Sequence, residues 1–149
     1  MGNISVTSGL NKNESGISHI EYSTVIILCC TILIIASPYI YKIFYNMSKS
    51  AAETSTAGTV EYVKSIYTRT NLTKDVGLPF KVTFNKDSYT AYDNGKKITL
   101  PVINDLTLEG KKPEGGSVII NPDGKISVKD LDFGWRKCNK SKNGDITCE

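Results

Sequence analysis

The feature that most constrains this chain is a run of twenty residues, 22–41, that contains no charged side chain. A helix of that length is about 30 Å long, which matches the hydrocarbon core of a bilayer. Isoleucine, leucine and valine fill much of the run, so a helix formed here is apolar on every side. We therefore predict a membrane-spanning helix near the N-terminus.

Two alternatives to a membrane span stay open. The run can be the core helix of a soluble domain, although a domain of roughly a hundred residues rarely needs a helix that is apolar on all faces. It can also be a cleaved secretory signal, which needs a shorter apolar region and a small-x-small cleavage site. Ala36, Ser37 and Pro38 fit that site poorly, because the apolar pattern continues through Phe44.

The helical pattern does not stop at residue 41 but becomes amphipathic. Apolar residues recur near helical spacing up to Ile66 and Tyr67, with charged residues between them. We expect one helix from about Ser18 to about Arg69, whose part over 42–70 lays an apolar stripe on a domain. Pro38 predicts a kink or local unwinding, and the small polar residues of 48–59 predict a softer stretch.

After residues 77–79 the apolar period changes from helical spacing to two, which predicts strands. The expected strands cover residues 80–84, 89–92, 97–100, 106–108, 118–120 and 125–128. Asn94-Gly95 and the Pro-Asp-Gly sequence at 122–124 predict tight turns between neighbouring strands. The fold class is therefore α+β, with a long N-terminal helix packed on an antiparallel sheet of about five to seven strands within a globular domain over 71–149.

The four cysteines fall into two groups. Cys29 and Cys30 lie in the apolar run, where they behave as small hydrophobic residues. Cys138 and Cys148 flank a polar loop, and such a pair predicts a disulfide in an oxidising, extracytoplasmic location, with two free thiols as the alternative. His19 is the only histidine and there is no CxxC motif, so we expect no metal site and no cofactor.

Four residues around the apolar run form a pattern: Gly16, Ile17, Glu21 and Pro38. This pattern resembles the class III leader of the type IV pilin and pseudopilin family. The resemblance implies that residues 1–16 are a leader, that a prepilin peptidase cuts after Gly16, and that it methylates the new amino terminus at Ile17. It also implies that 17–41 is the transmembrane and assembly helix, with Glu21 acting in assembly and Pro38 shaping the helix.

The charge on Glu21 is costly at the edge of an apolar helix unless it is paired. In a filament, the amino group of a neighbouring subunit can supply the partner. Two unit charges 4 Å apart attract by about 4 kcal/mol at an effective dielectric constant of 20. Such a pair would select one axial register between apolar helices, and the alternative is a Glu21 side chain that simply reaches the membrane surface.

The rest of the chain adds to the resemblance. A long N-terminal helix followed by an antiparallel sheet is the pilin architecture. The apolar residues 118–120 before Pro122, Asp123 and Gly124 resemble the H-type minor pseudopilin group. The pair Cys138 and Cys148 resembles the disulfide-bounded loop of many pilins.

A small basic cluster with one aromatic residue lies near the C-terminus, and it consists of Trp135, Arg136, Lys137, Lys140 and Lys142. Lysine and arginine can hold DNA phosphates while a tryptophan stacks on a base, so the cluster predicts a DNA contact. A solvated surface loop is the alternative.

These observations predict a structural subunit, major or minor, of a type IV pilus, competence pseudopilus or secretion pseudopilus. The expected partners are other pilin subunits, the prepilin peptidase, an inner-membrane assembly platform and the membrane itself. The protein would cross the cell membrane once, with an extracytoplasmic C-terminal domain, before it enters a filament. The alternative is an uncleaved single-pass membrane protein whose outer domain binds a ligand or partner. A nucleophile–base arrangement is not apparent, so we expect no enzymatic activity.

Overall fold

The computed structural model describes residues 19–86, 88–100 and 108–149. Its contacts divide the chain into two compact units, Met1–Tyr41 and Lys42–Glu149. The predicted leader, with Gly16 and Ile17, lies outside the described residues.

A single helix, α1 (His19–Thr73), contains 55 residues and confirms the predicted long N-terminal helix. It continues without interruption through Pro38 and through residues 48–59, so neither segment unwinds. The hydroxyl groups of Thr54, Thr56 and Thr59 in the second segment donate hydrogen bonds to carbonyl groups one turn earlier, so their protons have acceptors within the helix.

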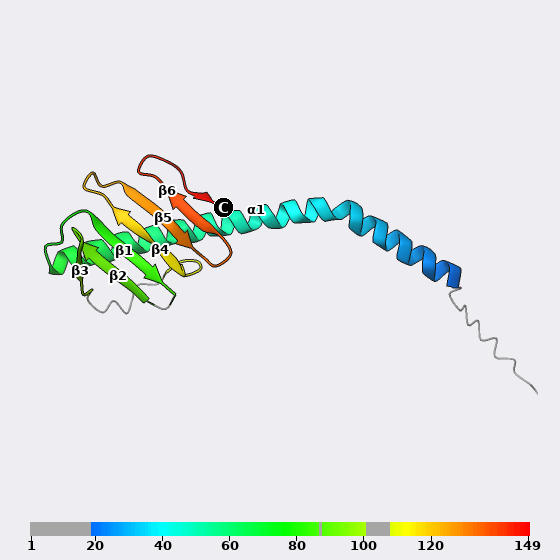
Figure 1. Cartoon of the computed structure of the whole chain (residues 1–149), viewed down its shortest axis with the longest axis horizontal. Coiled ribbons are helices and arrows are strands. Elements are labelled where there is room, and N and C mark those ends of the chain that lie inside the picture. Colours follow the sequence, from blue (N-terminus) through cyan, green and yellow to red (C-terminus); the bar gives the residue numbers. More distant parts are fainter. Residues whose placement is uncertain (1–18, 87, 101–107) are drawn as a thin grey trace, which may run out of the picture. The chain divides into compact units, whose positions relative to one another are not determined.

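The second unit contains one antiparallel sheet of seven strands, in the order β3-β2-β1-β4-β5-β6-β7 (Figure 1). The strands are β1 (Phe80–Asn85), β2 (Ser88–Asp93), β3 (Lys96–Ile98), β4 (Gly115–Ile120), β5 (Ile126–Asp132), β6 (Lys137–Lys140) and β7 (Thr147–Cys148). The α+β prediction is confirmed. Leu106 and Thr107 of one expected strand lie outside the described residues, and β6 and β7 were not expected individually.

The second half of α1 packs on one face of this sheet (Figure 1). Alternate residues of β1 point into the core, so Phe80, Val82 and Phe84 are almost fully buried. From the helix, Val63 and Ile66 meet them in the same buried cluster. The amphipathic pattern of residues 42–70 therefore reflects the contact of α1 with the sheet.

The turns follow the predicted chemistry. Asn94 and Gly95 both have positive φ, at 44° and 83°, which a tight hairpin between β2 and β3 requires. Between β4 and β5, Gly124 has a φ of 77°. The Asn121 amide closes that turn by donating to the Lys125 carbonyl and to the Ser127 hydroxyl, each at 2.9 Å.

The small residues of 48–59 have a packing role that the sequence pattern does not show. A Cβ atom on Gly58 would overlap the backbone carbonyl oxygen of Glu109, in the segment that leads to β4. A Cβ atom on Gly110, where φ is +88°, would lie 2.8 Å from the Ser55 hydroxyl oxygen. The Ser55 hydroxyl also accepts a hydrogen bond from the Lys111 amide at 3.2 Å. Small side chains therefore allow this segment to lie directly on α1.

Candidate functional site

The first candidate surface is the part of α1 that belongs to the first unit. This helix is long and apolar enough to cross a membrane, and none of the residues in its most apolar 18-residue window is buried. Ten aliphatic side chains are between 44% and 79% exposed: Ile20, Val25, Ile26, Ile27, Leu28, Ile32, Leu33, Ile34, Ile35 and Ile40. We call this set the apolar helix surface.

Two threonine side chains within this segment suit an apolar environment. Thr24 donates a hydrogen bond to the Ile20 carbonyl, and Thr31 donates to the Leu28 carbonyl, both at 2.8 Å. Because each hydroxyl proton has an acceptor within the helix, neither threonine needs water. Cys29 and Cys30 are exposed free thiols in the same segment.

Glu21 lies in the first turn of α1. The amide groups at a helix N-terminus favour a nearby carboxylate by about 0.3–1 kcal/mol, which offsets a small part of the cost of a charge beside lipid. Pairing with the amino group of a neighbouring subunit would offset much more of this cost, and it stays a prediction. Pro38 lies inside α1, within the apolar segment.

The predicted disulfide is present and lies in the core of the second unit. Cys138 and Cys148 face each other in the β6–β7 pair, with their Cα atoms 4.1 Å apart. Both residues are nearly inaccessible, at 0% and 4% exposure. Within the enclosed loop, the Lys140 ammonium donates to the Gly144 carbonyl at 2.7 Å. The crosslink therefore holds the last strand, at the edge of the sheet, against β6.

The basic cluster is divided by the structure into two groups at opposite ends of β6. Trp135 and Arg136 precede this strand, whereas Lys140 ends it and Lys142 follows it. A strand of four residues is about 13 Å long, so the two groups are separated by roughly that distance. Lys142 lies 3.9 Å from the Asp123 carboxylate, in the turn between β4 and β5. DNA binding by this cluster stays a prediction.

Arg136 makes contacts that the sequence did not suggest. Its Nε donates to the Ser48 hydroxyl at 3.0 Å, and its guanidinium lies over the Tyr45 ring with 4.2 Å between the guanidinium carbon and the ring centre. A terminal nitrogen lies 3.4 Å from the Tyr45 carbonyl oxygen. The neighbouring Lys137 is 3.8 Å from Asp132. Arg136 therefore connects the turn between β5 and β6 to α1.

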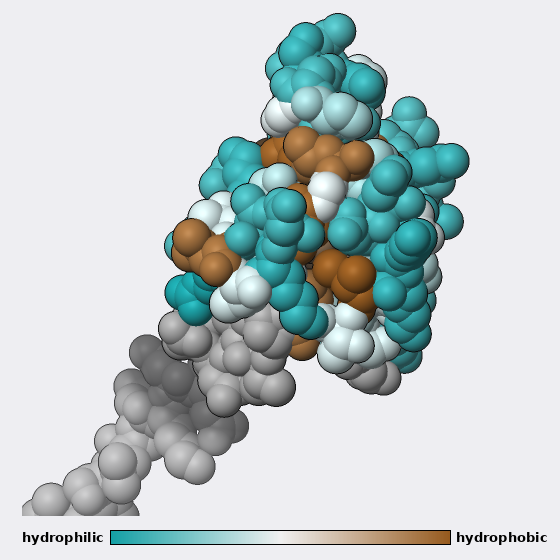
Figure 2. Space-filling model, turned by 90° about the vertical axis from the view of Figure 1, so that its left-hand side faces the viewer, coloured by the Kyte–Doolittle hydropathy of each residue, from teal (hydrophilic) through white to brown (hydrophobic). Residues whose placement is uncertain are grey.

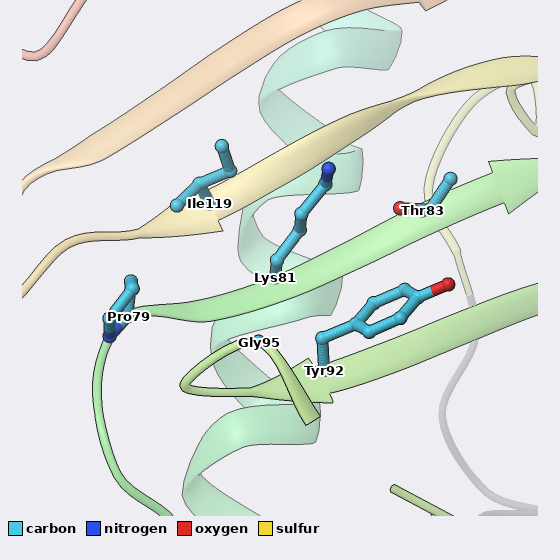
Figure 3. Close-up of a pocket in the computed structure, with 6 residues that line it drawn as sticks. All are labelled: Pro79, Lys81, Thr83, Tyr92, Gly95 and Ile119. Atoms are coloured by element: carbon cyan, nitrogen blue, oxygen red, sulfur yellow. The ribbon is translucent and has the colours of Figure 1, made fainter. Parts of the chain in front are cut away.

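A second candidate surface is a depression of about 580 Å³ on the sheet face that lies opposite α1 (Figure 3). The side chains of Lys81 and Tyr92 lie side by side across β1 and β2, and Ile119 on β4 lies on the other side of Lys81. Sequence reasoning missed this site. The only signal was an outward-facing position of β4 occupied by isoleucine instead of a polar residue.

Tyr62 and Tyr89 form a polar contact at the edge of the core. Their rings meet edge to face, with centroids 6.2 Å apart. Burial, followed by the hydrogen bond and the charge interaction with Tyr89, raises the pKa of Tyr62 from 10.0 to about 12. The folded state therefore favours the neutral form of Tyr62. The described residues contain no group of three or more His, Cys, Asp or Glu side chains that could hold a metal ion.

Comparison of the chain with known protein families, with curated proteins and with solved structures finds no match.

Proposed function

We propose that this protein is a structural subunit, of the pilin or pseudopilin type, that assembles into a filament through the apolar helix surface. One observation carries the proposal: this surface is exposed on all sides, whereas the same helix is packed on a sheet after residue 42. Full burial of one large aliphatic side chain is worth about 1.5–3 kcal/mol. Ten such side chains amount to tens of kcal/mol at most, which exceeds the stability of a typical domain. Water therefore does not cover this surface.

Lipid chains and neighbouring apolar helices are the two kinds of contact that can bury such a surface. A membrane would hold the subunit first, and identical or related helices would replace the lipid in the filament. Lipid chains are as apolar as leucine, so apolar contact alone gives little preference for helix over lipid and none for one register. A directional contact is needed, and the resemblance to pilins assigns it to Glu21. A prepilin peptidase that cuts after Gly16 would supply the amino group at Ile17.

The first test is the mass of the protein extracted from its native membrane. The proposal predicts a chain that begins at Ile17 with one additional methyl group. In cells with a working prepilin peptidase, an intact Met1 terminus would instead support the single-pass membrane protein.

The second test is the substitution Glu21→Ala, compared with Glu53→Ala as a matched control in the same helix. Glu53 forms an exposed pair with Lys49 at 4.0 Å, and such pairs contribute little. We expect Glu21→Ala to lower the yield of sheared filaments more than about tenfold, since 1.4 kcal/mol corresponds to a factor of ten. Membrane insertion should be unchanged in both variants. Wild-type filament yield from Glu21→Ala would contradict the proposal.

The depression around Lys81 and Tyr92 favours a second candidate function. In an uncleaved single-pass membrane protein, this surface would bind a ligand or partner outside the cell. That candidate predicts a retained Met1 terminus and a protein that stays dispersed in the membrane. Lys81→Ala would then reduce partner binding.

A further inference from the structure

A short turn between β5 and β6, residues 133–136, exposes the only tryptophan of the chain. The Phe133 amide donates to the Arg136 carbonyl at 2.9 Å, and Gly134 has a φ of +84°, so the turn is closed by its own backbone. Phe133 is fully buried, and its ring centroid lies 6.5 Å from that of Trp135. Trp135 itself is 43% exposed. The turn therefore exposes the Trp135 side chain on a backbone that is held by the buried Phe133 and by the hydrogen bond between Phe133 and Arg136.

The contacts of Arg136 place this turn beside the first turns of α1 within the second unit. Tyr45 and Ser48, which Arg136 contacts, follow Tyr41 by four and seven residues. These intervals correspond to about 6 and 10 Å along a helix. The chain enters the second unit at Lys42, directly after the uncharged run, so a bilayer that holds this run ends close to the turn. This proximity follows from the short stretch of helix between Tyr41 and the residues that Arg136 contacts.

The side chains at this end of the second unit are those typical of a membrane interface. Four exposed apolar or aromatic side chains lie on the first turns of the helix there: Ile43, Phe44, Tyr45 and Met47. Tryptophan and tyrosine prefer the level of the lipid headgroups, and arginine and lysine direct their charges towards the phosphates. The opposite end of the same unit is mostly hydrophilic, with some apolar side chains exposed between the polar ones (Figure 2).

We propose that the 133–136 turn rests in the headgroup layer of the membrane, with Trp135 as the anchor. The layer is about 5–8 Å thick on each side of the hydrocarbon core. It therefore overlaps the level of Tyr45, where Arg136 holds the turn. Acidic groups are also present at this end, because Asp132 lies near Lys137 and Glu114 pairs with Lys111. The contact consequently depends on the aromatic ring more than on net charge, and the partner is the phospholipid surface.

This contact would hold the domain on the bilayer before assembly. The proposal rests only on the membrane-spanning part of the proposed function and does not require a filament. Because Trp135 is the only tryptophan, its fluorescence reports the contact directly.

The experiment uses the full chain, reconstituted at low density in vesicles of phosphatidylcholine and phosphatidylglycerol. Phosphatidylcholine with brominated acyl chains then quenches tryptophans close to the hydrocarbon. Two variants that carry Trp135→Phe calibrate the assay. Leu33→Trp places the reporter in the apolar run. Tyr92→Trp places the reporter far from the membrane end of the second unit. The neighbouring residue Asp93 pairs with Phe80, whose ring centroid lies 5.3 Å from that of Tyr67. Tyr67 lies about 33 Å along α1 from Tyr45.

We expect brominated lipid to reduce the emission of Trp135 to a level between the two controls, with a blue-shifted maximum. Quenching equal to that of Tyr92→Trp, with strong quenching of Leu33→Trp, would overturn the anchor and leave the filament proposal intact. Unquenched Leu33→Trp would overturn the membrane span and the anchor with it. Quenched Trp135 in a protein that forms no filaments would support the anchor and contradict only the assembly proposal.

Discussion

For the substitution Gly58→Ala, helix propensity and packing predict changes of opposite sign in the free energy of unfolding. Glycine within a helix costs about 1 kcal/mol relative to alanine, so propensity alone predicts that Gly58→Ala stabilises the domain. The structure predicts the reverse. A Cβ atom at this position would overlap the Glu109 carbonyl oxygen and lie 3.2 Å from the Glu109 carbonyl carbon and 3.3 Å from its Cβ. Two of these three atoms belong to the backbone, which cannot move aside as a flexible side chain does.

The size of the stability change follows from the overpacking cost and the gain in helix propensity. Overpacking of a well-packed site costs about 1–3 kcal/mol, and the gain in propensity offsets about 1 kcal/mol of it. The expected net loss is therefore about 1 kcal/mol. With a urea dependence of about 2 kcal/mol per molar, the unfolding midpoint should fall by about 0.5 M.

Trp135 emission in the detergent-solubilised full chain can follow this unfolding. Ala57→Gly is the matched control, since Ala57 is exposed in the same turn of α1. It should lower the midpoint through propensity alone. A higher midpoint for Gly58→Ala than for the wild type would refute the close approach of α1 to the segment before β4.

Two further predictions concern the second unit. Cys138 and Cys148 are separated by 10 positions, and reduction of their disulfide should lower the free energy of unfolding by about 3 kcal/mol. The urea midpoint with and without reductant measures this change. An unchanged midpoint after complete reduction would contradict the prediction. The raised pKa of Tyr62 favours its neutral form in the folded state, so this contribution to stability is fully present below pH 10 and is lost as the pH rises towards 12. Tyr62→Phe should therefore weaken the fall in the urea midpoint between neutral pH and about pH 11, and an equal fall in both proteins would refute the assignment.

Local patterns in the sequence were sufficient for much of the fold. The uncharged run, the alternation in β1 and the Asn94-Gly95 turn each depend on neighbouring residues, and each predicted its element correctly. The last strands are different, because β6 and β7 are short and contain Lys137, Asn139 and Lys140, which have no alternating apolar pattern. Their pairing depends on the crosslink and on β5 instead.

The candidate sites could be predicted only where they are local in sequence. The apolar helix surface lies within one continuous segment. The contact between Arg136 and Tyr45 joins residues 91 positions apart, and no periodicity in either segment encodes it. The same limit explains why the sequence grouped Trp135 with Lys142, although β6 separates them.

The two halves of α1 contain the same threonine-to-carbonyl hydrogen bond in different surroundings. Thr24 and Thr56 both donate to a carbonyl four residues earlier at 2.8 Å, yet Thr24 lies in the exposed apolar segment and Thr56 is fully buried against the sheet domain. In the second half, Gly58 packs directly against the backbone of Glu109, so this surface cannot take another packing partner. The first half has exposed apolar side chains in every direction. A surface of that kind can exchange lipid for other helices at little cost, which is what the proposed move from a membrane into a filament would require.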